Sequence, residues 1–475
     1  MEPGDQDERT RPLTRQELAD AEAALAEVNA TLAAHSDLSE DGLAVGFART
    51  RENFRYVAAE ATWKQWTGSL WGDDKTLSVY TKIREFVRWR AQHETDSEKV
   101  KKDLKQAKTI SAIERLLRSD PRYAATIDQW DRDPWQLNTP GGLVNLRTGS
   151  LGPSDREAYC TRITAVTPQG ECPLWRRFLN DVTEGDQELI DFLQRLFGYA
   201  LTGSVREHTL AFVYGSGGNG KGVLLGTLMG VFGTYAGTAP SEVFMESRND
   251  RHPTELAHLK GHRLIISQEV DQGRRWNESR LKSLTGGDPI TARKMRGDPF
   301  TFQPAFKLVV AGNHRPRLNS VDEAIRRRLL LIPFSVTVPA SRRDPDLAEK
   351  LRAEWPGILN WCVAGCLDYL AQGLCPPDRV RAATDAYLKS QDVMGDWFEA
   401  NLETGPDYWV SPTDLFSDWR SYMEKFNEGP GKQTEFAERL ESRGYFKKKD
   451  NARGRYWAGL RLRRSAGSSD PPEWA

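Results

Sequence analysis

The sequence contains no hydrophobic run that approaches the roughly 18 apolar residues needed to span a bilayer. Its first residues, MEPGDQDERTRP, are acidic and polar, so they do not form a secretory signal. Cysteine is scarce: the five cysteines are odd in number and form no C-x-x-C pair. We therefore expect a reduced, cytoplasmic protein with no membrane partner.

Net charge is also lacking, because 66 lysines and arginines nearly balance 67 aspartates and glutamates and leave a formal charge of -1. This balance gives no chain-wide attraction to nucleic acid, so any basic surface must be local. Histidine is sparse, and Gly261 interrupts any helix between His258 and His262. With no cysteine or carboxylate cluster beside these two residues and His252, the sequence predicts no zinc site.

A glycine-rich segment near the middle of the chain carries the strongest signal. The apolar run 210–214 is short enough for a buried strand, and a second apolar run, 223–232, ends at Gly233. Between them the order of strand, glycine turn and helix is the context of a phosphate-binding P-loop, in which backbone N–H groups and a lysine bind phosphate oxygens. The predicted nucleotide-binding residues are Gly215, Ser216, Gly217, Gly218, Asn219, Gly220, Lys221 and Gly222.

Gly222 departs from the usual P-loop pattern. The residue after the lysine is normally a serine or threonine whose hydroxyl binds magnesium. We therefore expect Mg²⁺ to be held by the phosphates, water and an acidic group from elsewhere in the chain.

Polar side chains follow two further predicted strands. The apolar run 264–267 precedes Glu269, and the apolar run 308–311 precedes Asn313. In an open α/β sheet, ligands bind beyond the carboxyl ends of the strands, so both side chains should meet the Lys221 loop. Glu269 is predicted to polarise the attacking water or hold the metal, and Asn313 to orient that water near the terminal phosphate.

Two basic segments lie within the same region. A Gly-Gly-Asp-Pro turn at 286–289 precedes Arg293 and Lys294, which predicts an exposed hairpin or loop that carries cations. The triplet 326–328 places three arginines before a buried apolar run. Adjacent guanidinium groups are costly to bury without anionic partners, and the ATP of a neighbouring subunit would supply one.

These segments together resemble superfamily-three helicases, ring-forming AAA+ motors of viruses, phages and plasmids. Within that group the similarity is to the phage and plasmid primase-helicases related to the poxvirus primase-helicase. It extends over residues 54–372 and rests on GSGGNGKG, RHPTELAHLKGHRLIISQE, WNESRLKSLTGGDPITARKM, LVVAGNHRPRL and VDEAIRRRLLLIPF, with W-x-x-W-T-G-x-x-W and LNTPGGLVNLRTG upstream and EWPGILNW downstream.

The resemblance implies an ATP- and Mg²⁺-dependent DNA helicase that forms a homohexamer and moves 3′→5′ on single-stranded or forked DNA. It implies replication of a phage or mobile element in bacterial cytoplasm, together with a separate primase or other replisome proteins. The implied roles are the Walker A lysine for Lys221, the Walker B carboxylate for Glu269, the sensor for Asn313, pore-loop DNA contacts for Arg293 and Lys294, and the trans-acting finger for Arg327 or Arg328. We expect no primase domain here, although Asp131 and Asp133 imitate a polymerase metal pair.

The C-terminal part predicts a winged helix-turn-helix. Helices are expected at 397–401, 411–426 and 432–443, followed by a hairpin over 445–464 with its turn near 451–454. Nine lysines and arginines and one acid, Asp450, lie between Arg443 and Arg464. The predicted DNA contacts are Lys447, Lys448, Lys449, Arg453 and Arg455. The alternative is a solvated edge hairpin whose cations prevent aggregation.

The sequence thus predicts an α/β protein with an AAA+ P-loop core, in which helices flank a parallel sheet, an N-terminal α+β helicase-associated domain and a C-terminal winged helix. The expected segments are a polar tail and helix (1–50), the helicase-associated domain with a helical collar (51–204), the AAA+ domain (205–340), a helical extension (341–392), the winged-helix domain (393–466) and a tail (467–475). Two alternatives remain open: an ATP-regulated origin-binding initiator that does not unwind processively, and a P-loop enzyme acting on a small molecule.

Overall fold

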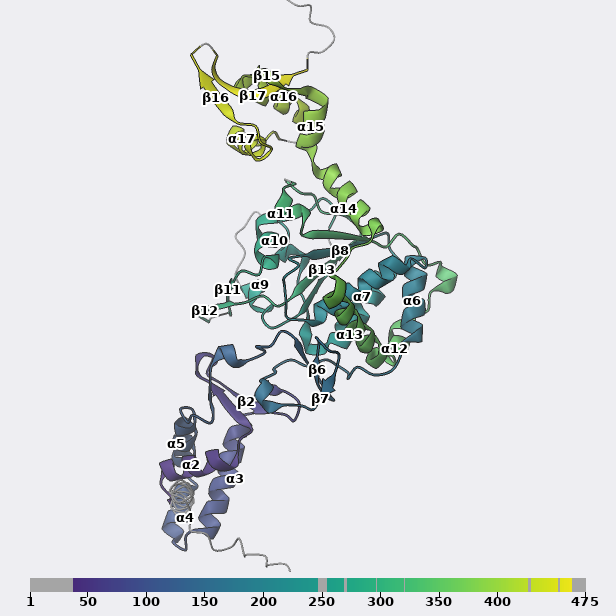
Figure 1. Ribbon diagram of the computed structural model, residues 1–475. Coiled ribbons are helices and arrows are strands. Elements are labelled where there is room, and N and C mark those ends of the chain that lie inside the picture. The colour runs from purple at the N-terminus through teal and green to yellow at the C-terminus, as the bar shows by residue number, and fades with distance from the viewer. Residues whose placement is uncertain are drawn as a thin grey trace, which may run out of the picture.

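The computed structural model describes residues 37–246, 254–268, 271–295, 297–319, 321–425, 429–451 and 453–463. Glu269 and the Ala-rich helix expected at 17–34 therefore lie outside the described residues. Within those ranges, no helix has both the length and the apolar character that crossing a membrane requires. Figure 1 shows a mixed α/β chain in which the parallel sheet occupies the central part.

Over residues 37–125, the N-terminal part combines four helices and short strands around one core. Its elements are α2 (Glu40–Thr50), β1 (Phe54–Val57), β2 (Thr62–Trp66), β3 (Trp71–Asp73), α3 (Ser78–His93), α4 (Glu98–Leu104), α5 (Ala107–Leu117) and β4 (Ala124–Ala125). The strands β2 and β3 pair antiparallel and form a tryptophan-rich hairpin around Gly68.

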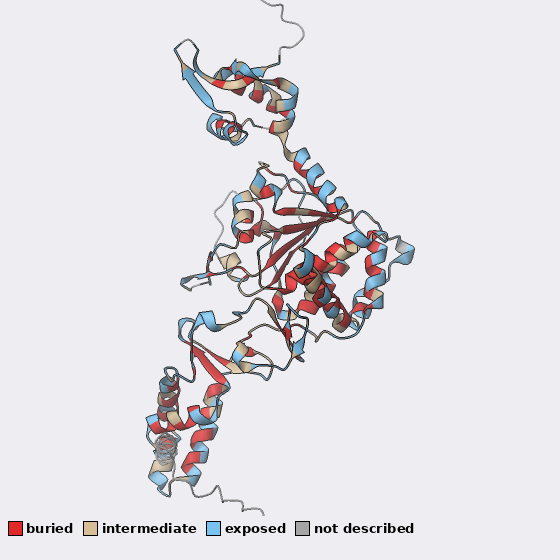
Figure 2. Cartoon of the chain, viewed as in Figure 1, coloured by how far each residue is buried: buried red, intermediate tan, exposed pale blue. Residues whose placement is uncertain are grey.

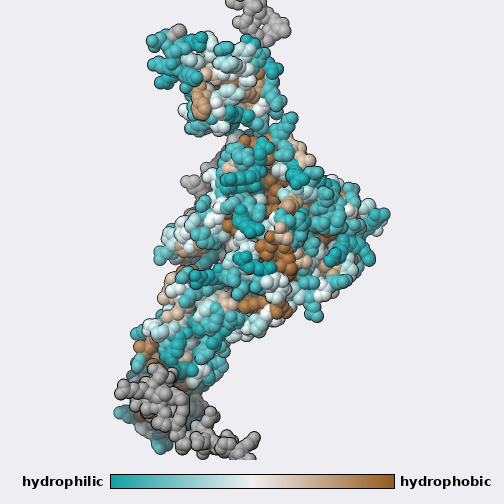
Figure 3. Space-filling view, in the orientation of Figure 1, coloured by the Kyte–Doolittle hydropathy of each residue, from teal (hydrophilic) through white to brown (hydrophobic). Residues whose placement is uncertain are grey.

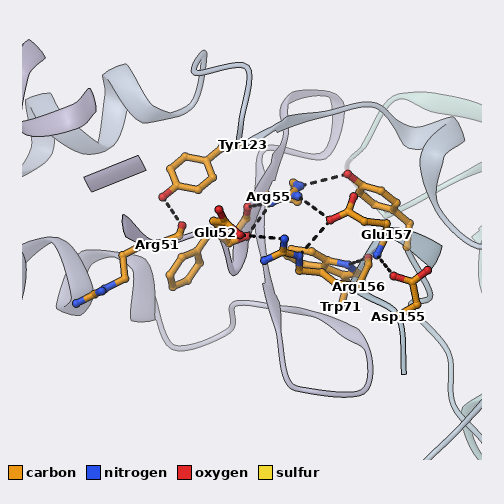
Figure 4. A network of polar contacts seen from close by, with 10 residues as sticks. Arg51, Glu52, Arg55, Trp71, Tyr123, Asp155, Arg156 and Glu157 are labelled. Carbon is orange, nitrogen blue, oxygen red and sulfur yellow. Dashed lines mark hydrogen bonds and ion pairs between the residues drawn. The ribbon is translucent and has the colours of Figure 1, made fainter. Parts of the chain in front are cut away.

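Two tryptophans of this hairpin, Trp63 and Trp71, are buried, and Figure 4 shows Trp71 between Arg55 and Arg156. The ring of Trp71 is buried, and its Nε1 donates to the carbonyl of Arg156 over 2.8 Å. The guanidinium of Arg55 lies 4.9 Å from the ring centroid, which adds a cation–π contact. Trp71 therefore belongs to a small buried core.

The central part is built on a five-stranded parallel sheet with the strand order β14-β8-β13-β10-β9. These strands are β8 (Leu210–Tyr214), β9 (Ala236–Thr238), β10 (Leu264–Ser267), β13 (Lys307–Gly312) and β14 (Leu329–Pro333). Alternate residues of β8 fill two cores: Leu210 and Phe212 on one face, and Ala211 and Val213 on the other. Burial on both faces explains why these strands are continuous apolar runs.

Helices cover the sheet faces, as Figure 2 shows by the burial of their inner sides. They are α6 (Pro173–Thr183), α7 (Gln187–Leu201), α8 (Lys221–Phe232), α10 (Glu278–Thr285), α11 (Glu323–Arg326), α12 (Leu347–Arg352), α13 (Trp355–Gln372) and α14 (Asp378–Gln391). One hydrophobic core contains buried residues of α6, α7, α8 and α13 together. Helices before and after residue 205, where the sequence predicts a domain boundary, therefore share that core.

Two buried cations attach the sheet to the end of α7. Arg263 donates to the carbonyl of Leu201 over 2.6 Å, and Lys307 donates to the carbonyl of Thr202. Cations stabilise a helix C-terminus because its last carbonyls are unsatisfied and carry negative partial charge. Burial lowers the pKa of Lys307 well below its usual value. The amino ends of β10 and β13 are thereby fixed, while their carboxyl ends face the opposite edge.

Smaller hairpins project from this framework. One antiparallel sheet is formed by β5 (Gln136–Thr139), β6 (Gly142–Asn145) and β7 (Leu151–Gly152). The basic hairpin predicted after residue 286 is confirmed by β11 (Ile290–Arg293) and β12 (Pro299–Phe302), which pair antiparallel.

The C-terminal part contains the three helices that the sequence predicts, and one strand more. Its elements are α15 (Val393–Asn401), β15 (Leu402–Val410), α16 (Pro412–Glu424), α17 (Gln433–Ser442), β16 (Lys447–Asp450) and β17 (Gly454–Leu462). The strand β15 was not predicted, because Gly405, Pro406 and Asp407 interrupt it. Its register with β17 shifts between Thr404 and Trp409, which accommodates the interruption.

Candidate nucleotide-binding site

The glycine-rich loop between β8 and α8 adopts a backbone that side chains would obstruct. Gly218 and Gly220 have φ values of 76° and 83°, in the left-handed region that favours glycine. A Cβ at Gly215 would lie 2.0 Å from the carbonyl oxygen of Phe334. The loop is therefore held closely against the end of β14, and α8 begins at Lys221 immediately after it.

The ammonium group of Lys221 is directed into this loop. Its Nζ donates to the carbonyl of Gly215 over 2.7 Å and lies 3.3 Å from Oδ1 of Asn313. The residue is only 9% exposed, and burial lowers its pKa. The structure thus brings together two predicted site residues that are far apart in the sequence.

The side chain of Asn219 positions Lys221. The sequence predicted Asn219 only as a nucleotide-binding residue of the loop and did not predict this role. Its side chain is buried, and Oδ1 accepts from Lys221 Nζ over 3.0 Å. Its Nδ2 donates to the carbonyl of Phe334 over 3.0 Å. One amide therefore connects the lysine to the end of β14, a contact that depends on residues far apart in the chain.

A cleft of about 380 Å³ opens beside this lysine at the carboxyl ends of β10 and β13. A volume of this size falls within the range of small-molecule and cofactor sites. The lining residues are Lys221, Gly222, Leu225, Gln268, Asp271, Ala311, Gly312, Asn313 and His314.

The carboxylate of Asp271 lies in this cleft and was not predicted as a site residue. Asp271 and Gln268 flank position 269, which lies outside the described residues. The sequence signal was available, because Asp271 follows the same apolar run as Glu269. Asp271 and the amide of Gln268 provide oxygen donors of the type that Mg²⁺ prefers.

The segment after β14 covers the other side of the loop. The N–H of Val338 donates to the carbonyl of Gly218 over 3.0 Å, and Ser216 Oγ lies 3.2 Å from Thr337 Oγ1. A Cβ at Gly218 would lie 2.4 Å from the guanidinium of Arg343, so this cation rests against the loop. Arg343 was not predicted, because nothing local in the sequence shows that residues 337–343 return to the P-loop.

The three arginines before β14 have different environments. Arg326 forms an ion pair with Asp385 at 3.6 Å. Arg328 is buried and donates to the carbonyl of Ala324 over 2.8 Å and to Thr285 Oγ1 over 3.2 Å. Burial, aided by the charge of Arg327, lowers the pKa of Arg328. Arg327 is exposed on the surface.

The predicted DNA-contacting residues lie on two exposed hairpins. At the tip of the β11–β12 hairpin, Arg293 Nε donates to the carbonyl of Gly297 over 2.8 Å. The side chain of Lys294 is 64% exposed, and its Nζ lies 3.9 Å from Glu60 Oε1. The C-terminal residues Lys447, Lys448, Lys449, Arg453 and Arg455 are all exposed on β16, β17 and the turn between them.

A metal site made only of protein groups is not found in the part of the chain that the structure describes, since no three His, Cys, Asp or Glu residues cluster there. Burial lowers the pKa of His262 to about 4, so its ring is neutral at physiological pH. Asp131 accepts from the N–H of Thr161 over 2.7 Å, and Asp133 from the N–H of Trp135 over 2.8 Å. Asp133 therefore caps a local turn, whereas Asp131 holds a segment 30 positions away.

Comparison with known proteins supports the expected relationship. The family model described as "D5 N terminal like" matches residues 46–184, and a family of unknown function matches residues 213–328. A candidate helicase of Acanthamoeba polyphaga mimivirus is 25% identical over 336 residues, covering 64% of this chain and 34% of the relative. A candidate helicase of Frog virus 3 is 29% identical over 303 residues, covering 58% of this chain and 31% of the relative.

A candidate primase of African swine fever virus is 23% identical over 314 residues, covering 58% of this chain and 31% of the relative. The chain thus spans about a third of the length of the curated relatives it matches. Among solved structures, the apo C-terminal region of NrS-1 is similar with a TM-score of 0.49 and 10% identity, covering 86% of this chain and 95% of that one. The matched N-terminal model and the helicase- and primase-named viral relatives support the similarity of this chain to D5-type primase-helicases.

Proposed function

We propose that this protein is an ATP-dependent DNA helicase of phage- or plasmid-type replication. The observation that carries the proposal is the position of Lys221, whose Nζ lies 3.3 Å from Asn313 Oδ1 at the carboxyl edge of a parallel sheet. A cation on a glycine loop and an amide on the neighbouring strand are the groups that phosphoryl transfer requires at the outer phosphates.

The strand order supports an AAA+ core for this proposal. The P-loop strand β8 lies between β13, which carries Asn313, and β14, which follows the arginine triplet. Helix α8 directs its N-terminus toward the loop, and that end of a helix attracts phosphate. In this assignment Lys221 binds the outer phosphates, and Asn313 orients the attacking water.

The cleft also fits a magnesium ion. The loop glycines leave room for phosphates, and Asp271 contributes a carboxylate to the same cleft as Lys221. Mg²⁺ would be held by Asp271, by Glu269 and by the phosphates, and it would neutralise charge on the transferred group. Gly222 contributes no hydroxyl. The protein ligands of Mg²⁺ would therefore be the carboxylates of Asp271 and Glu269.

The arginines before β14 support a proposal that hydrolysis occurs at subunit interfaces. Arg328 donates hydrogen bonds to Ala324 and Thr285 of its own chain, whereas Arg327 is exposed. We assign Arg327 as the residue that reaches the ATP of the next subunit in a homohexamer. The hairpin with Arg293 and Lys294 would hold single-stranded DNA in the ring, and we propose movement in the 3′→5′ direction.

The C-terminal part supports a DNA-binding role. Its order of elements, α15-β15-α16-α17-β16-β17, is compatible with a winged helix, and its projecting hairpin is basic. It would engage forked DNA, and a separate primase would act beside it. The same feature favours the second candidate function, an initiator that assembles on origin DNA without processive unwinding.

Strand displacement on a forked substrate separates these two functions. We expect the wild-type protein to release the labelled strand with ATP and Mg²⁺, and not with a non-hydrolysable analogue. Lys294→Glu should reduce the release rate roughly tenfold or more, because it reverses one phosphate-attracting charge in every subunit. Lys389→Ala, an exposed lysine of α14, is the control.

The helicase proposal fails if the protein hydrolyses ATP and binds DNA but releases no strand. That outcome would leave the initiator function. ATP turnover that ignores single-stranded DNA would instead indicate a P-loop enzyme with a small-molecule substrate.

Gly222→Ser should lower the Mg²⁺ concentration needed for half-maximal ATP turnover by roughly fivefold. The serine hydroxyl would add one polar contact to the metal, and such a contact contributes about 1 kcal/mol. No atom outside the neighbouring helix backbone lies within 4 Å of a Cβ built at Gly222, so the new hydroxyl fits. The measurement is a magnesium titration of phosphate release at fixed ATP.

Gly226→Ser provides a matched control one turn further along α8. A Cβ there also meets no atom within 4 Å, so the two variants gain the same helix propensity. An equal shift in both variants would show that helix stability, and not metal coordination, had changed.

A further inference from the structure

The sheet of the C-terminal part has one face turned away from its helices. Trp457 of β17 and Val410 of β15 are buried in the core that α15, α16 and α17 form. Because successive side chains of a strand alternate between faces, their neighbours Tyr456, Ala458 and Trp409 lie on the opposite face. The pairing of Trp409 with Ala458 places two strands of this face side by side.

Large aromatic rings are exposed on this face. Trp409 is 44% exposed, and Phe446, next to β16, is 61% exposed. The carbonyl of Phe446 accepts from the N–H of Ala458, which puts Phe446 in the same row as Trp409 with a small residue between them. The rings of Trp409 and Tyr456 meet edge to face at 6.3 Å.

Cations are interleaved with these rings. The guanidinium of Arg453 lies 5.3 Å from the centroid of Trp409 and 5.7 Å from that of Tyr456. Lys448 pairs directly with Tyr456 across β16 and β17. Figure 2 shows β16 exposed along its length, and Figure 3 shows a hydrophilic surface on the projecting hairpin. We call Trp409, Phe446, Tyr456, Arg453 and Lys448 the aromatic platform.

The helix that would normally read duplex DNA has the wrong charge. In a helix-turn-helix unit the second helix enters the major groove. Here that helix is α17, which exposes Glu435, Glu438 and Glu441. Three carboxylates along this helix would be repelled by the phosphates that line the groove.

We propose that the aromatic platform binds single-stranded nucleic acid by stacking bases on Trp409, Tyr456 and Phe446, while Arg453 and Lys448 contact the phosphates. Exposed rings with adjacent cations are the elements of a single-strand binding surface. Paired bases of a duplex are already stacked on each other, so these rings gain little from double-stranded DNA. This inference deepens the proposed function by assigning the C-terminal part to the displaced or loading strand of a fork.

The test compares binding of labelled single-stranded and duplex oligonucleotides by fluorescence anisotropy, with the full chain and without nucleotide. The Trp409→Ala/Tyr456→Ala double variant should bind single strands at least about fivefold more weakly for each lost stacking partner. The single variant Trp409→Phe should keep most of the wild-type affinity for single strands, since phenylalanine still offers an aromatic face. Lys448→Ala should reduce the slope of log K against log salt by about 0.7, the value for one phosphate on a single strand.

Two controls separate this surface from the rest of the molecule. Trp89→Ala removes another exposed tryptophan, on α3, and should bind as the wild type does. Glu438→Ala on α17 should also leave single-strand binding unchanged. Matched DNA and RNA oligonucleotides show whether the platform discriminates between the two chemistries.

The inference is overturned if the double variant binds single strands normally, or if it loses duplex and single-strand binding equally. Normal binding with an intact fold would leave the exposed rings to a protein partner. Failure of the proposed function looks different: the protein would then bind single strands through Trp409 yet release no strand from a fork. Normal unwinding and normal binding by the double variant would overturn this inference alone.

Discussion

Replacing Lys221 by alanine is expected to reduce ATP turnover roughly 10²- to 10³-fold, the loss typical of removing one group that stabilises transition-state charge. The ammonium is nearly enclosed and lies within 3.3 Å of oxygens of Gly215, Asn219 and Asn313. A charge held this way is effective because little water screens it. Phosphate release per subunit at saturating ATP is the measurement, and fluorescent-nucleotide titration reports binding separately.

The fold should survive this substitution. Burial lowers the pKa of Lys221, so the folded state disfavours its charged form relative to the unfolded state. The stability cost of that charge is largest below the folded-state pKa and disappears as the pH rises through 10.5, the ordinary lysine value. Alanine removes this cost, and we expect no large fall in the thermal unfolding midpoint at neutral pH.

The surface variant Lys108→Ala, on α5, controls for the loss of a lysine as such. Turnover of the Lys221→Ala protein within tenfold of wild type would contradict the assignment of this loop as the catalytic phosphate site.

Arg327→Ala is expected to lower turnover roughly 10³-fold or more, as the loss of an arginine finger does. The reason is its exposure at the start of β14, where it is available to a neighbouring subunit. In a mixture with Lys221→Ala protein, some interfaces would combine an intact lysine with an intact arginine. Random 1:1 assembly in a closed ring predicts recovery of about a quarter of wild-type turnover.

Arg328→Ala is the matched comparison, because it removes the adjacent guanidinium. Its hydrogen bonds to Ala324 and Thr285 lie within the chain, so its loss should lower the unfolding midpoint. It should not be complemented by Lys221→Ala protein. If Arg328→Ala is complemented and Arg327→Ala is not, the two assignments must be exchanged.

Local sequence was sufficient where a few adjacent residues determine the conformation. The loop glycines at 218 and 220 take left-handed backbone angles, and only short-range sterics are needed to foresee this. The apolar runs of β8, β10 and β13 were recognisable for a similar reason, because strands buried on both faces carry little else. The same reasoning identified the basic hairpins, whose turns are local.

Contacts between distant segments were decided only by the tertiary structure. The sequence offered Arg327 and Arg328 equally, and packing against Thr285 separates them by burying Arg328. The link from Asn219 to Phe334 joins residues 115 positions apart.

The strand β15 is a case in which the local sequence disfavours a strand and long-range pairing forms one. Its Gly-Pro-Asp interruption argues against a strand, yet pairing with β17 forms one and turns Trp409 outward. The sequence by itself therefore determined the phosphate loop, the strands and the basic hairpins, since each depends on neighbouring residues. Which side chains become free, buried or adjacent depended on long-range packing, because the energy of those contacts exists only once the segments have met.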